Sequence, residues 1–173
     1  MYRKIQRFLS PLKKLRDFYK KERVMSLSDY LDDRSIVFLN VLTVEEALQA
    51  LVQALSDADK LRSREKFYRA ILQREQIVST GIGLGIAIPH AKLANYKDFF
   101  IGVGIQKNKG LEWNALDGFP VHLIFMIGGP DNRQSEYLNI LARLTLVLKN
   151  PEKRSSILKA TSTHQVIDLF KEP

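Results

Sequence analysis

Residues 74–92 read REQIVSTGIGLGIAIPHAK, and this stretch constrains the structure of the chain more than any other. It passes through glycines and a short apolar run and then reaches Pro89 and His90. Proline fixes its own φ angle and lacks an N–H, so His90 follows a stiffened backbone position. Because an imidazole titrates near neutral pH, it suits nucleophilic or proton-transfer chemistry. His90 is therefore the first candidate for a catalytic residue.

Two kinds of donor in this stretch favour binding of an anion at His90. Arg74 is expected at the end of a helix over residues 63–74, and the return of the chain through the glycines brings its guanidinium toward the imidazole. Arginine matches phosphate oxygens with two parallel hydrogen bonds. Thr80 and the backbone amides of residues 81–85 are candidates for further donors.

The glycines Gly81, Gly83 and Gly85 have a spacing that matches no nucleotide-binding motif. A dinucleotide fingerprint reads GxGxxG with an acidic residue about 20 residues later, and a P-loop ends in GK[ST]. Taken alone, the group predicts a tight turn. Because glycines also let a bound group approach the backbone closely, Gly81 and Gly83 join Thr80 as candidate phosphate-supporting residues.

Composition narrows the class of protein. The 173 residues, 45% of them hydrophobic, suffice for one domain with a sizeable core. The absence of cysteine excludes disulfides and thiolate chemistry. No apolar run approaches the roughly 20 residues that span a bilayer, and no apolar signal-peptide region begins the chain. No histidine pair has the spacing of metal ligands. We therefore expect a cytoplasmic protein without a metal site.

The net charge of +8 is concentrated at one end of the chain. Residues 1–23 hold nine Lys or Arg against Asp17 and Glu22, which gives +7 and leaves +1 for the rest. The body of the protein is therefore close to neutral. Such a distribution does not favour a nucleic-acid-binding domain.

The basic segment also carries apolar residues at steps of three and four, which is typical of one face of a helix. They are Ile5, Phe8, Leu9, Leu12, Leu15 and Tyr19, and Pro11 interrupts them. We divide the chain into a basic amphipathic extension, residues 1–24, and a domain, residues 25–173. Three interpretations of the extension stay open: a helix packed on protein, contact with an anionic membrane surface or partner, and contact with nucleic acid.

Strand and helix patterns alternate along the domain. Strands are predicted at 36–39, 99–106 and 121–127, and helices after Thr43, at 63–74, at 135–148, at 152–159 and at 164–170. The continuous apolar run 121–127 is typical of a strand buried on both faces. This order predicts an α/β fold with a mixed, mainly parallel β-sheet flanked by helices on both faces.

Residues 75–91 as a whole are far more specific than their parts. The chain resembles the EIIA proteins of the bacterial phosphotransferase system, fructose–mannitol class. In that family an acidic or amide residue is followed, after six positions, by an apolar-Gly-x-x-apolar-Ala-apolar-Pro-His-small string, here Glu75 and then residues 82–91. The resemblance runs from about Leu27 to Phe170, and residues 79–83 are most similar to the nitrogen-related branch.

The resemblance implies that His90 accepts a phosphoryl group from the phosphohistidine of a small carrier, HPr or its nitrogen-branch counterpart. It also implies that Arg74 is the active-site arginine and that no cofactor takes part. One imidazole nitrogen must be unprotonated to attack, while the other is held by an acceptor that the sequence does not identify. Downstream partners would be regulated proteins or a separate EIIB.

One position departs from the family pattern. A second histidine often occurs in a Ser-x-His-Leu-x-x-Leu-Ala string, and here the string reads SEYLNILA, with Tyr137 in the place of that histidine. Tyrosine can donate a hydrogen bond to a phosphoryl oxygen but cannot become an imidazolium. Its role is therefore open between phosphate binding and simple packing. The other two histidines, His122 in a strand and His164 at a helix start, are expected to be structural.

Three functions stay open on the sequence alone. The first is a stand-alone regulatory relay that is phosphorylated on His90. The second is a sugar-transport EIIA that works with separate EIIB and EIIC chains. The third is a protein-binding module in which the histidine site is vestigial. The oligomeric state is open as well.

Overall fold

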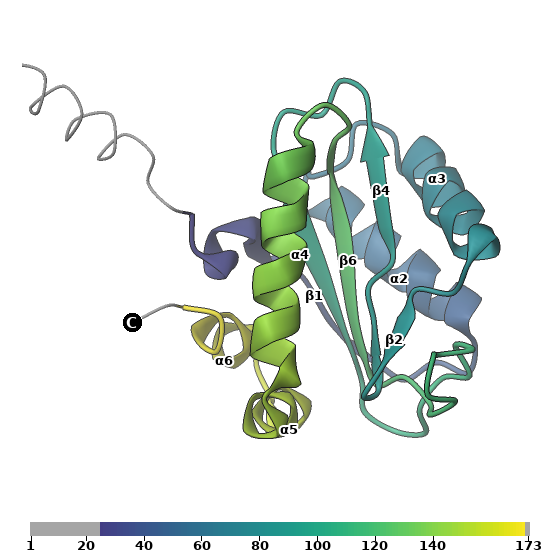
Figure 1. Ribbon diagram of the computed structural model, residues 1–173, viewed down its shortest axis with the longest axis vertical. Coiled ribbons are helices and arrows are strands. Elements are labelled where there is room, and N and C mark those ends of the chain that lie inside the picture. Colours follow the sequence, from purple (N-terminus) through teal and green to yellow (C-terminus); the bar gives the residue numbers. More distant parts are fainter. Residues whose placement is uncertain (1–24, 172–173) are drawn as a thin grey trace, which may run out of the picture.

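The computed structural model describes residues 25–171. The helix predicted within residues 1–24 lies outside the described residues. In the described part, six strands form one sheet with helices on both sides (Figure 1).

The sheet is mixed, as predicted. Its strands are β1 (Leu31–Leu39), β2 (Gly81–Gly83), β3 (Ile86–Ala87), β4 (His90–Leu93), β5 (Phe100–Gln106) and β6 (Leu123–Pro130). The order is β1-β5-β6-β3-β2, and β4 pairs with β6 beyond the end of β3. Three pairings are parallel (β1 with β5, β3 with β6, β4 with β6) and two are antiparallel (β5 with β6, β2 with β3).

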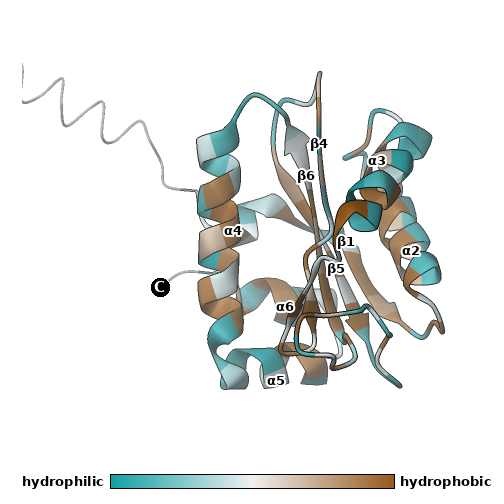
Figure 2. Cartoon of the chain, turned by 45° about the vertical axis from the view of Figure 1, so that its right-hand side comes forward, coloured by the Kyte–Doolittle hydropathy of each residue, from teal (hydrophilic) through white to brown (hydrophobic). Residues whose placement is uncertain are grey.

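Helices cover the two faces of the sheet separately (Figure 1). One face packs on α2 (Val44–Asp57) and α3 (Arg64–Ile77). The other packs on η1 (Leu27–Tyr30), α4 (Gln134–Lys149), α5 (Pro151–Lys159) and α6 (Thr163–Asp168). Figure 2 shows the sheet between the helices of the two sides.

Strand β6 joins the two cores because its successive side chains point to opposite faces. Phe125 and Ile127 belong to the core under α4, whereas Ile124 and Met126 belong to the core under α2 and α3. This arrangement explains the continuous apolar run in the sequence and confirms the prediction of a strand buried on both faces.

Helix starts also follow the sequence. The Thr43 hydroxyl accepts a hydrogen bond from Glu46 N (3.2 Å), and the Glu46 carboxylate accepts one from Thr43 N (3.0 Å), which forms a capping box at the start of α2. Ser63 caps α3 in a similar way by accepting from Lys66 N (3.3 Å). Both helices begin where the sequence predicts them.

Several boundaries differ from the predictions. Strand β1 begins at Leu31 and α3 continues three residues past Arg74, to Ile77. His122 precedes β6, and β6 continues through Gly128 and Gly129 instead of ending before them. The pairing with β4 extends the strand this far.

The two glycines of β6 are needed for steric reasons. A Cβ on Gly128 would lie 2.3 Å from Phe100, and a Cβ on Gly129 would lie 2.2 Å from Phe99.

We predict that Gly128→Ala destabilises the protein by about 3 kcal/mol, because the added methyl group meets the buried rings of Phe100 and Phe67. Gly118→Ala is the matched control, since its Cβ has no heavy atom within 4 Å and the change costs only the positive φ angle, about 1 kcal/mol. Urea denaturation measures both free energies of unfolding. Equal losses would contradict the steric explanation.

Candidate functional site

His90 opens β4 at a break in the strand that accompanies β6. Residues Ile88 and Pro89 separate β3 from β4, and the Pro89 carbonyl accepts a hydrogen bond from Ile127 N (2.9 Å). Proline has no N–H to donate, so the parallel ladder is interrupted there. The imidazole of His90 emerges half-buried just after this break.

Two hydrogen bonds define the protonation state of His90. Nδ1 lies 2.9 Å from the carbonyl oxygen of Ile88, and because a carbonyl only accepts, Nδ1 carries the proton. Nε2 accepts a hydrogen bond from Arg74 Nε (3.1 Å), so Nε2 carries the lone pair. The ring is therefore neutral, with the lone pair on Nε2. Ile88 is the acceptor that the sequence left unidentified.

Electrostatics favour the same neutral state. Burial of the ring lowers the pKa of His90 below its ordinary 6.5, and the positive charges of Arg74 and Lys92 lower it further. The hydrogen bond to Ile88 and the charge of Glu75 act in the opposite direction without reversing the shift. At neutral pH the imidazole is thus in the uncharged form that a nucleophilic role requires.

Arg74 reaches His90 from the last turn of α3. Its Nη1 donates to the carbonyl oxygen of Val78 (2.9 Å), which fixes the guanidinium plane at the helix end. Within residues 25–171, Nη2 has no acceptor. This group therefore has donors left for an anion that binds at Nε2 of His90.

Tyr137, in the first turn of α4, lies on the other side of the imidazole. The two ring centroids are 5.5 Å apart, and the tyrosine residue is almost fully buried. No described residue bonds its hydroxyl. Among residues 25–171 every buried side-chain polar atom has a partner, so this hydroxyl reaches solvent. Burial raises the pKa of Tyr137, which keeps the phenol protonated and able to donate.

The glycine group forms a hairpin, as the tight-turn prediction required. Strands β2 and β3 are joined by Leu84 and Gly85, both with positive φ angles (58° and 73°), which is the two-residue turn that matches strand twist. Asp117 holds the turn by accepting from Leu84 N (2.8 Å).

The hairpin lies away from the imidazole. Gly83 pairs with Ile86, which pairs with Leu123 of β6, whereas His90 pairs with Ile127, four residues further on. At about 3.3 Å per residue, the separation along β6 is roughly 13 Å. This position does not support direct contact of Gly83 with a phosphoryl group on His90.

The other predicted donors already have acceptors inside the protein. Thr80 donates to the Glu75 carboxylate from its amide (2.8 Å) and from its hydroxyl (2.5 Å), and Gly81 N donates to Ser79 Oγ (3.1 Å). Thr80 is buried, and buried donors require such partners. Thr80 and Gly81 thus build the loop beside the site.

Glu75 is a residue whose role the sequence reasoning missed. Besides Thr80, its carboxylate accepts a hydrogen bond from Trp113 Nε1 (2.9 Å), which ties the end of α3 to the loop before β6. The signal was present, because Glu75 is the acidic residue of the signature string. Its partner Trp113 lies 38 residues away in sequence and was not recognisable as such.

The remaining histidines occupy structural positions. The ring of His122 is half-buried and its Nδ1 lies 3.2 Å from the carbonyl oxygen of Gln106. His164 is exposed in the first turn of α6. Among residues 25–171, no group of three or more His, Cys, Asp or Glu is placed to hold a metal ion.

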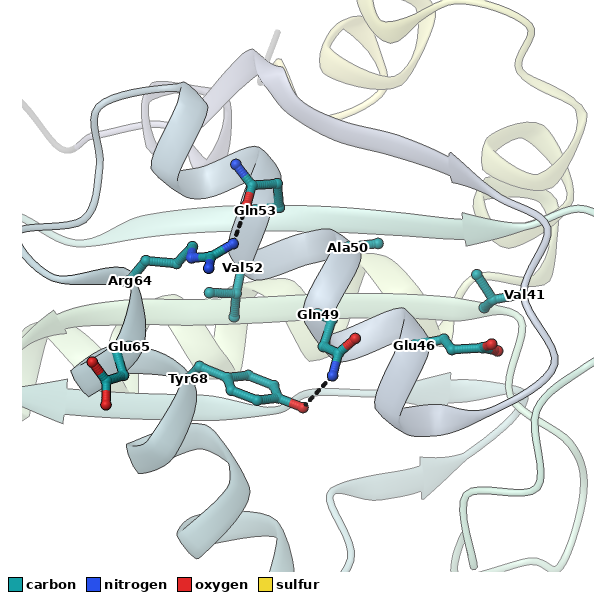
Figure 3. A pocket seen from close by; sticks show the side chains of 9 residues that line it. All are labelled: Val41, Glu46, Gln49, Ala50, Val52, Gln53, Arg64, Glu65 and Tyr68. Atoms are coloured by element: carbon teal, nitrogen blue, oxygen red, sulfur yellow. Dashed lines mark hydrogen bonds between the residues drawn. The ribbon is translucent and has the colours of Figure 1, made fainter.

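A hollow of about 650 Å³ lies between α2 and α3, where Arg64 bonds Gln53 and Gln49 Nε2 donates to the Tyr68 hydroxyl (3.2 Å) (Figure 3). Neither His90 nor Arg74 contributes to it. This hollow is therefore separate from the candidate site.

The fold is that of a phosphotransferase-system component. The model of the family described as "Phosphoenolpyruvate-dependent sugar phosphotransferase system, EIIA 2" matches residues 29–172, and the chain belongs to this family.

Relatives of two kinds match the chain. The fructose-specific EIIABC component of Bacillus subtilis is 40% identical over 128 residues, which cover 74% of this chain and 20% of that protein. The chain thus spans a fifth of that relative. The nitrogen regulatory protein of Bradyrhizobium diazoefficiens is 29% identical over 151 residues, which cover 86% of this chain and 97% of that protein.

A solved structure agrees with the fold. The nitrogen regulatory protein IIA-Ntr of Neisseria meningitidis superimposes with a TM-score of 0.77 at 25% identity, covering 84% of this chain and 99% of that chain. This match confirms the predicted α/β architecture of the EIIA type.

The site geometry predicts the titration of His90. In Arg74→Ala the pKa of His90 rises toward 6.5, because a neighbouring positive charge that disfavours the imidazolium is removed. Nitrogen-15 NMR of the imidazole against pH measures the value and also shows which nitrogen carries the proton. Arg69→Ala, an exposed arginine on the same helix that pairs with Glu65, serves as the control and leaves the pKa unchanged. A neutral ring protonated at Nε2 would contradict the assignment.

Proposed function

We propose that His90 accepts a phosphoryl group on Nε2 from the phosphohistidine of an HPr-like carrier, and that the protein acts mainly as a regulatory relay. The observation that carries this proposal is the pair of hydrogen bonds on one ring: Nδ1–H donates to Ile88, and the lone pair of Nε2 faces Arg74.

The chemistry balances without a metal ion. The lone pair of Nε2 attacks phosphorus while the bond from phosphorus to the donor imidazole breaks and its electron pair returns to that ring. The proton on Nδ1 stays in place, and the Ile88 carbonyl stabilises the positive charge that develops on the ring.

Arg74 has two roles in this step. As the phosphoryl group approaches, Nε of Arg74 gives up its hydrogen bond to Nε2 of His90, and Nε and Nη2 donate instead to the peripheral oxygens, where charge accumulates. The Tyr137 hydroxyl is the second donor to those oxygens. Thr80, Gly81 and Gly83 support the site from outside it, through the loop that Glu75 holds.

The nature of the relatives supports a regulatory output without excluding transport. One relative is named a nitrogen regulatory protein and covers most of this chain, and another is a fructose-specific component that includes EIIB and EIIC. The partners that we propose are therefore the carrier and either regulated proteins or a separate EIIB. No helix within residues 25–171 is long and apolar enough to cross a membrane. The cytoplasmic location and the membrane contact of residues 1–24 stay predictions.

The second candidate function is a binding module in which His90 is not phosphorylated. The observation that favours it is Tyr137, because a neutral phenol cannot supply the charge of a second histidine. Phosphorylation of His90 discriminates between the two functions.

Intact-protein mass spectrometry after incubation with phosphoenolpyruvate, Enzyme I and HPr is the direct test. We expect one acid-labile phosphoryl group on the protein and none on a folded His90→Ala variant. A folded wild-type protein that no carrier phosphorylates would instead support the binding module.

Tyr137→Phe tests the role of the hydroxyl. We expect phosphoryl transfer to slow roughly tenfold, since one hydrogen bond to a charged oxygen is lost while the ring stays in place. Rapid-quench measurement of phospho-His90 gives the rate, with Asn139→Ala, an exposed change on the same helix, as the control. An unchanged rate with the folded structure intact would show that Tyr137 only packs against His90.

A further inference from the structure

Lys92 is a second cation near His90. It lies two residues later on β4, so its side chain leaves the same face of the strand as the imidazole. Its Nζ lies 4.6 Å from the centroid of the Tyr137 ring, and that ring also contacts His90, with centroids 5.5 Å apart. His90, Tyr137 and Lys92 thus form one cluster.

The present contacts of Lys92 are with uncharged groups. Nζ donates to the side-chain amide oxygen of Gln134, at the start of α4, and rests over an aromatic ring. Among residues 25–171 it forms no ion pair with a carboxylate. Contact of an ammonium with a ring stabilises only modestly where water has access, and an amide oxygen carries no net charge, whereas a phosphoryl dianion carries the opposite charge. A phosphoryl group would therefore be a better partner than either present neighbour.

The long stem of lysine makes such an exchange feasible. Four methylene groups let the ammonium turn from the ring face to a nearby anion without movement of β4. The ammonium already acts on the imidazole, since its charge contributes to the lowered pKa of His90. Arg74 approaches His90 from α3, whereas Lys92 comes from β4 on the side of Tyr137.

We propose that Lys92 is a second phosphoryl-binding cation, which rests on Tyr137 and Gln134 in the free protein and pairs with the phosphoryl group once it is on His90. This inference rests on the proposed function. The inference also extends the proposed function. Pairing of Lys92 with the phosphoryl group releases Gln134 and one face of Tyr137, so the surface at the start of α4 changes with phosphorylation.

Phosphorus-31 NMR of phospho-His90 against pH tests the pairing. Phosphoramidate, a small phosphoryl donor, labels the histidine without a carrier. A cation in contact with the phosphoryl group lowers the pKa of that group, so Lys92→Met should raise it by about one unit relative to the wild type. Lys92→Arg, which keeps the charge, should restore most of the shift.

The control is Lys97→Met, which removes an exposed lysine in the loop between β4 and β5 and should leave the phosphoryl pKa unchanged. Wild-type and Lys92→Met proteins with equal phosphoryl pKa values would overturn the inference while leaving the relay intact. Labelling by phosphoramidate but not by any carrier would refute the relay, and the titration would still decide the role of Lys92. A folded protein that neither donor labels would overturn both.

Discussion

The hydrogen bond from His90 Nδ1 to the carbonyl oxygen of Ile88 can fix the tautomer of the ring only if that carbonyl is itself held in place. Ile88 is held on two sides: its N–H donates to the Thr80 carbonyl (3.0 Å), and its side chain is buried in the core under α4. The following Pro89 has a fixed φ angle and accepts from Ile127 N. The acceptor is thus part of the sheet, and the tautomer of His90 is set by the backbone before any ligand arrives.

The end of α3 links this backbone to the charges of the site. Arg74 and Glu75 are consecutive, and their side chains leave the helix in different directions. Arg74 turns to His90, while Glu75 accepts hydrogen bonds from Thr80 and Trp113. The residue that binds the imidazole and the residue that fixes the loop before β2 therefore share one helical turn. A shift of α3 would disturb both the guanidinium and the loop whose Thr80 carbonyl holds Ile88.

Local sequence patterns predict much of the fold. The caps at Thr43 and Ser63, the apolar run of β6 and the mixed sheet follow from spacing and composition, as does the contact of Arg74 with His90. Other features depend on side-chain partners that no local pattern reveals. Thr80 was expected to donate to a phosphoryl group, but Glu75 accepts its hydrogen bonds, and the predicted tight turn is held by Asp117, 33 residues away. The extent of β6 through Gly128 could not be predicted either, because it depends on pairing with β4 and on the space that Phe100 takes.

Tyr137 changes the electrostatics of the site as well as its shape. A histidine at this position would titrate near neutral pH, whereas a buried phenol stays neutral. The positive charge that acts on His90 then comes from Arg74 and Lys92. The stacked arrangement of Lys92 on Tyr137 is specific to an aromatic ring with a negative face. In this chain the Tyr137 ring therefore binds the Lys92 ammonium close to the imidazole of His90. A protonated histidine in the place of Tyr137 would repel the ammonium.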